Sequence, residues 1–154
     1  MARVREEVEI AAPAERVWAV VHEDLRNAPK WSSNLDRAES LDDEPPGKGS
    51  HIRYRIKLPG GGRSELEVVQ TTFNRPKRCA GKFVDGPLEG SWSYSYDEDD
   101  GHTRLVYEMD FRLGGALGFA SGWIGRQYAD GIRKNMAGLK RYVESGKGPQ
   151  PRRK

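Results

Sequence analysis

The feature that most constrains this chain is a long amphipathic segment near its C-terminus. Apolar residues recur there at three- and four-residue spacing and so share one helix face: Leu117, Ile124, Tyr128, Ile132, Met136, Leu139, Tyr142 and Val143. The pattern predicts a helix over residues 115–145, ended by Ser145-Gly146 and the following Pro149. At about 1.5 Å per residue it would run about 45 Å. So long a helix needs a broad apolar surface, which the rest of the chain must supply.

The chain before this helix is predicted to form strands that each carry one apolar face. Apolar and polar residues alternate over 3–10, 51–58, 91–96 and 104–113, and weaker patterns cover 35–41, 65–72 and 79–84. Turn residues separate these runs, as in Pro59-Gly60-Gly61-Gly62. Two short helices are expected after the first strand, one at about residues 13–22 and one between Asp24 and Pro29.

This order predicts an α+β fold in which a curved, seven-stranded antiparallel sheet wraps around the long C-terminal helix. A helix is only about 10 Å wide, so a seven-stranded sheet is wider than the helix that packs against it. The mismatch leaves a hollow between them unless large side chains fill it. We expect residues 1–146 to form a single domain and residues 147–154 to be a basic, disordered tail.

Three local stretches resemble the START/Bet v 1-like (SRPBCC) superfamily, and within it the bacterial polyketide cyclase/dehydrase and lipid-transport proteins. They are Val8–Trp18, similar to the family's opening strand and helix; Gly90–Leu105, similar to its last hairpin; and Asn135–Lys140, similar to the end of its closing helix. The resemblance implies the helix-grip fold. It also implies ligands such as lipids, hormones, quinones or polyketide intermediates, and it supplies no invariant catalytic motif to carry over.

Charge and composition narrow the function classes. The 154 residues carry a net charge of +3; the tail residues Lys147, Arg152, Arg153 and Lys154 contribute +4, which leaves residues 1–146 at −1. We therefore expect no nucleic-acid partner. The sequence shows no signal peptide and no transmembrane run, and its lone Cys79 fits a reducing compartment. These features predict a cytoplasmic protein.

Common catalytic and metal-binding motifs are missing from the sequence. His22, His51 and His102 are not at metal-ligand spacing. The three glycines at 60–62 lack the ending of a phosphate loop, and no serine stands in a nucleophile elbow. We therefore expect no metal and no cofactor.

The candidate site consists of large or polar residues on predicted inward faces: Tyr54, Trp92, Tyr94, Tyr107, Tyr128 and Asn135. One interpretation is amphipathic packing, with each ring buried and each hydroxyl bonded to backbone. The other is an aromatic-lined pocket whose few polar groups orient a ligand. The second interpretation predicts a cavity of at least about 300 Å³.

Phe119 and Trp123 lie off the apolar stripe of the long helix, near Gly118 and Gly122. Two aromatics on the solvent side need a partner. That partner is either a loop of the same chain or something that binds there: an entering ligand, a membrane in transient contact, or the second subunit of a homodimer. The ligand interpretation predicts that Phe119 and Trp123 form the cavity entrance.

Three functions follow from these predictions. The first is a binding protein for a hydrophobic small molecule such as a lipid, a quinone or a polyketide-like aromatic. The second is an enzyme of the cyclase or dehydratase (aromatase-like) type that uses the same cavity. We favour the first over the second because the sheet pattern places no Asp, Glu or His inward to act as acid or base. The third is a non-catalytic interaction or stress-response domain.

Overall fold

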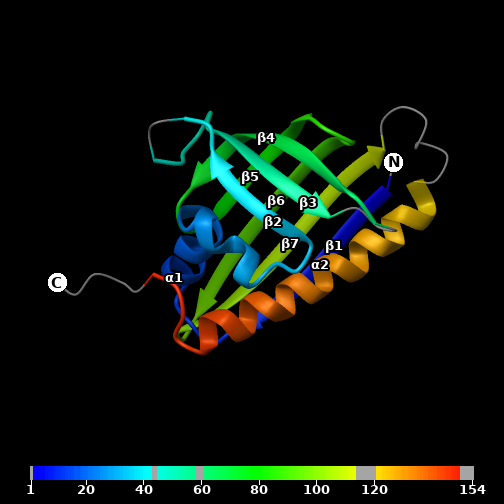
Figure 1. Cartoon of the computed structure of the whole chain (residues 1–154). Helices are drawn as coiled ribbons and strands as arrows, with labels where there is room; N and C mark the ends of the chain where they lie inside the picture. Colours follow the sequence, from blue (N-terminus) through cyan, green and yellow to red (C-terminus); the bar gives the residue numbers. More distant parts are fainter. Residues whose placement is uncertain (1, 43–44, 58–60, 114–120, 150–154) are drawn as a thin grey trace.

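The computed structural model describes residues 2–42, 45–57, 61–113 and 121–149. Along the chain the elements are β1 (Ala2–Ile10), α1 (Ala14–Trp18), η1 (Ala19–Glu23), η2 (Leu25–Lys30), β2 (Leu35–Ser40), β3 (His51–Lys57), β4 (Arg63–Asn74), β5 (Arg78–Asp85), β6 (Leu88–Asp99), β7 (His102–Leu113) and α2 (Ser121–Glu144). The sheet curls over α2, and the short helical turns lie at one end of the sheet (Figure 1).

The described strands form one sheet in the order β1-β7-β6-β5-β4-β3-β2, and every neighbouring pair is antiparallel. The predicted seven-stranded antiparallel sheet is confirmed. Residues 88–113 form a long hairpin in which Trp92 pairs with Met109 and Tyr94 pairs with Tyr107. Because side chains alternate between the two faces of a strand, these four project together from the concave face.

The helix α2 packs along β1 and closes the concave side of the sheet. Its buried face carries Ile132, Met136, Leu139 and Val143, as the spacing predicts. Polar contacts at the margin hold the helix to β1: Lys140 Nζ donates to the carbonyl of Glu9 at 2.7 Å, and Arg133 pairs with Glu6 at 3.1 Å. The predicted helix over 115–145 is confirmed from Ser121 to Glu144, while residues 114–120 lie outside the described part.

The two predicted short helices are present, and each differs in form from a regular α-helix. The first is an α-helical turn, α1, that widens into the π-helical turn η1. The second, η2, is a 3₁₀-helix with Pro29 inside it rather than at its limit. The π-helical turn matters for the site. It contains one residue more than an α-helical turn and therefore changes the directions in which the neighbouring side chains point. Val20, Val21 and His22 are all buried there.

Part of the predicted tail lies against the body of the protein. Arg16 Nη2 donates to the carbonyl of Lys147 at 3.3 Å, and a side chain at Gly148 would meet Val20 and Tyr142. Residues 150–154 lie outside the described part, so their disorder stays a prediction. Among the helices that the structure describes, none is long and apolar enough to cross a membrane.

Candidate ligand-binding site

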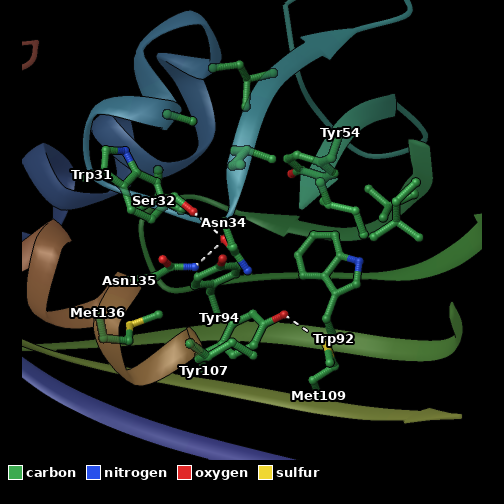
Figure 2. Close-up of a pocket in the computed structure, with 18 of the residues that line it drawn as sticks. Trp31, Ser32, Asn34, Tyr54, Trp92, Tyr94, Tyr107, Met109, Asn135 and Met136 are labelled. Carbon is green, nitrogen blue, oxygen red and sulfur yellow. Dashed lines mark hydrogen bonds between the residues drawn. The ribbon is translucent and has the colours of Figure 1, made fainter. Parts of the chain in front are cut away.

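A cavity of about 140 Å³ lies between the concave face of the sheet, the η1–η2 segment and α2. Its wall is mainly apolar and aromatic, as Figure 2 shows. The lining residues include Val21, His22, Leu25, Trp31, Ser32, Asn34, Tyr54, Ile56, Leu66, Val68, Phe83, Leu88, Trp92, Tyr94, Tyr107, Met109, Ile132, Asn135 and Met136. The cavity thus lies between the sheet, the short helical turns and α2.

Interlocking aromatic rings form the sheet side of this cavity. The ring centroid of Tyr94 lies 4.7 Å from that of Tyr107, 5.9 Å from that of Trp92 and 5.0 Å from that of His22. Gly81 of β5 makes room for the Trp92 indole, since a Cβ there would lie 2.6 Å from it. Because these rings fill much of the hollow, the predicted volume of at least about 300 Å³ is wrong.

The described lining is uncharged near neutral pH. Burial raises the pKa of Tyr54 and of Tyr107 above the ordinary phenol value, and raises that of Tyr94 well above it. Burial also lowers the pKa of His22 from its ordinary 6.5 to about 3. Each shift has the same leading cause, the loss of solvation of the charged form. A neutral, mostly apolar wall suits a hydrophobic ligand better than an ionic one.

His22 is a site residue that the sequence reasoning missed. Its imidazole Nε2 lies 2.7 Å from the phenol oxygen of Tyr96, and its ring centroid lies 4.5 Å from that of Trp18. The predicted site residues come from the sheet and the long C-terminal helix, whereas His22 enters the cavity from η1. The spacing from Trp18, four residues earlier in a helical segment, was the available signal.

Asn135 closes the cavity between α2 and the loop at residues 31–34. Its Oδ1 accepts a hydrogen bond from Ser33 N at 3.1 Å, and its Nδ2 donates to Asn34 Oδ1 at 2.8 Å. Ser32 Oγ also donates to Asn34 Oδ1, at 3.0 Å. Figure 2 shows the two hydrogen bonds that meet at the Asn34 amide oxygen. One residue of α2 thus ties the helix to the loop that leads into β2.

The structure brings five of the six predicted site residues together: Tyr54, Trp92, Tyr94, Tyr107 and Asn135 all line the cavity. That they contact a ligand stays a prediction. The side chains of Tyr128 and Trp123 are outside the described set, as is the whole of Phe119, so the predicted entrance is not tested. Among the described residues, no three His, Cys, Asp or Glu side chains gather as metal ligands.

A family model described as polyketide cyclase / dehydrase and lipid transport matches residues 1–144. The chain belongs to this family. Both terms of the description concern hydrophobic small molecules, which agrees with the neutral cavity. No curated protein matches the sequence.

Solved structures share the fold at low sequence identity. A protein of Thermus thermophilus is 17% identical, with a TM-score of 0.80 over 95% of this chain and 99% of that one. A START superfamily protein of Mycobacterium smegmatis is 16% identical, with a TM-score of 0.75 over 93% and 99%. The di-domain ARO/CYC protein BexL of the BE-7585A biosynthetic pathway is 19% identical, with a TM-score of 0.72 over 94% of this chain and 47% of that one. The fold is therefore the helix-grip fold of the START/Bet v 1 superfamily.

Proposed function

We propose that the protein binds a hydrophobic small molecule, such as a lipid, a quinone or a polyketide-like aromatic, in the cavity under α2. The observation that carries this proposal is a mostly apolar and aromatic cavity wall whose described residues carry no formal charge at neutral pH. The cavity volume limits how much of a ligand can be buried there. A cavity of about 150 Å³ accepts benzene. At about 140 Å³, this cavity accepts one ring or a short alkyl segment, and a larger group requires Tyr94 or its neighbours to move.

Thermal unfolding with a panel of one-ring and two-ring aromatics, short alcohols and quinones tests the proposal. A ligand that binds only the folded state raises the unfolding temperature. At concentrations above Kd, the stabilisation grows with the logarithm of the ligand concentration. The Val68→Phe variant fills the cavity from β4 and should abolish the rise. Val69→Phe is the matched control, because Val69 is the next residue on the same strand and does not line the cavity. Equal responses of both variants would contradict binding in this cavity.

A second function, acid–base catalysis of the cyclase or dehydratase type, would use His22, whose imidazole is part of the described cavity lining. Such reactions need a group that accepts or donates a proton at the substrate. The imidazole Nε2 of His22 lies 2.7 Å from the phenol oxygen of Tyr96. Because burial lowers the pKa of His22 to about 3, the imidazole is a weak base, and this function ranks below ligand binding. Single-turnover measurements with a polyketide-type aromatic distinguish the two functions. A His22→Gln variant that binds this compound as well as the wild type but no longer converts it would support catalysis, whereas unchanged conversion would exclude a role for His22.

A further inference from the structure

A second hollow, of about 580 Å³, lies on the outside of the protein between η2, the 31–34 loop and the C-terminal half of α2. Four cationic side chains line it, namely Lys30, Lys134, Arg141 and Lys147. No carboxylate is among its described lining residues. We call this hollow the basic groove. Lys30 and Lys134 come from different elements, so the tertiary structure creates this concentration of charge.

The four cations of the basic groove have no ion-pair partner in the described part of the chain, although many other Arg and Lys side chains do. An acid, Asp24, lines an adjoining hollow that Lys30 and Lys147 also line. Its carboxylate accepts hydrogen bonds from Asn27 Nδ2 at 3.0 and 3.1 Å. Even with the charge of Asp24 counted, the four cations leave the groove with an excess of positive charge, which attracts an anion.

The basic groove and the cavity share a wall that is one side chain thick. Trp31 lines both hollows. Its indole Nε1 is buried and has no hydrogen-bond partner within the described part of the chain. Figure 2 draws this nitrogen on the side of the ring away from Asn34. On α2, Lys134 faces the groove and the adjacent Asn135 faces the cavity. Loop and helix touch at Gly138, where a Cβ would lie 2.5 Å from the carbonyl oxygen of Trp31.

This shared wall suits a ligand with two chemically different ends. A phosphate or similar anion held by solvent-exposed cations alone gains little, because water and salt screen the attraction. An apolar group buried in the cavity adds binding free energy in proportion to the apolar area removed from water. A ligand that carries both groups can use both hollows, provided that the Trp31 indole turns aside or the bonds of Asn135 to Ser33 and Asn34 open.

We propose that the basic groove binds the phosphate-type head of an amphiphilic ligand whose apolar end occupies the cavity. This inference rests on the proposed function, because it takes the cavity as the apolar half of one site. The four cations line one hollow, which fits a single anionic head group.

The test compares two ligands that differ in one group, 4-phenylbutanol and 4-phenylbutyl phosphate, by isothermal titration calorimetry. We expect the phosphate to bind at least about tenfold more tightly at low salt, and the difference to shrink in about 0.5 M salt. A Lys30→Gln/Lys134→Gln variant should lose most of the difference. Lys48→Gln/Lys82→Gln is the control with the same charge change, because these exposed lysines lie outside the groove.

The NMR signals of the tryptophan indole N–H groups locate the bound anion. The Trp31 signal is assigned as the one missing from a Trp31→Phe variant. The phosphate should shift the Trp31 signal more than the alcohol does. Equal affinities for the two ligands would overturn the inference and leave the proposed function intact, since the alcohol still binds. A phosphate preference that survives in Lys30→Gln/Lys134→Gln would also overturn it. If neither compound binds, the proposed function fails, and the inference with it.

Discussion

The imidazole Nε2 of His22 lies 2.7 Å from the phenol oxygen of Tyr96, and both side chains are buried. The two residues are 74 positions apart in the chain; His22 comes from η1 and Tyr96 from β6. Trp18, Phe73 and Tyr94 surround the imidazole with aromatic rings. A protonated imidazole in this apolar setting would lose most of its solvation without gaining a carboxylate partner among its described contacts.

Stability should therefore fall in mild acid through His22. Burial lowers its pKa from 6.5 to about 3, so below pH 6.5 the unfolded chain takes up a proton that the folded protein does not. The group's contribution is complete above pH 6.5 and is lost as pH falls toward about 3, by about 1.4 kcal/mol per pH unit. Urea unfolding between about pH 5 and pH 6.5 measures this loss.

The variant His22→Gln removes the titrating group and should flatten that pH dependence, whatever its stability at neutral pH. His102→Gln is the control, because His102 is exposed and its described ion-pair partner, Glu9, is 3.8 Å away. A His22→Gln protein with the wild-type slope would show that another group causes the acid sensitivity.

Two glycines of α2 should respond in opposite directions to substitution by alanine. At Gly138 the new Cβ would lie 2.5 Å from the Trp31 carbonyl oxygen, so loop or helix must shift, at a cost of about 1–3 kcal/mol. At Gly131 the nearest atom would be Asn34 Nδ2 at 3.8 Å, an ordinary contact. There alanine should stabilise the helix by about 0.5–1 kcal/mol. Chemical unfolding of both variants checks this, and equal stabilities would contradict the close contact at Gly138.

Replacing Asn135 with alanine should weaken the closure of the cavity. The change removes the bonds to Ser33 N and Asn34 Oδ1, and leaves buried polar groups unpaired at a cost of about 1–3 kcal/mol. Ligand release should also become faster, because the loop and α2 separate more easily. Stopped-flow displacement measures the release rate. Asn74→Ala at an exposed position is the control. Unchanged release from the Asn135 variant would argue against exit of the ligand between the 31–34 loop and α2.

Replacing Tyr94 with leucine should enlarge the cavity and change its ligand preference. Tyr94 contacts Trp92, Tyr107 and His22 at once, so a smaller side chain opens space at the centre of the aromatic wall. We expect a loss of about 1–3 kcal/mol in stability and tighter binding of two-ring aromatics relative to one-ring aromatics. Parallel titrations with toluene and naphthalene check the preference. An unchanged ratio would mean that the wall collapses around the smaller residue.

The sequence alone determined the elements and the faces that they bury. Alternation in strands and three- and four-residue spacing in a helix are local signals, and each assigns a side chain to one face without reference to the rest of the chain. For that reason Tyr54, Trp92, Tyr94, Tyr107 and Asn135 could be placed on inward faces and are found in the cavity wall. The difference in width between a seven-stranded sheet and a single helix likewise predicts a hollow between them.

Only the tertiary structure decided what that hollow contains. The cavity volume depends on how the rings of Tyr94, Tyr107 and Trp92 pack against each other, and no local pattern encodes that packing. The π-helical turn brought His22 to Tyr96, and the approach of the 31–34 loop to α2 gathered Lys30 and Lys134 around one groove. These relationships join residues far apart in the chain, and their geometry follows from the simultaneous packing of the whole core.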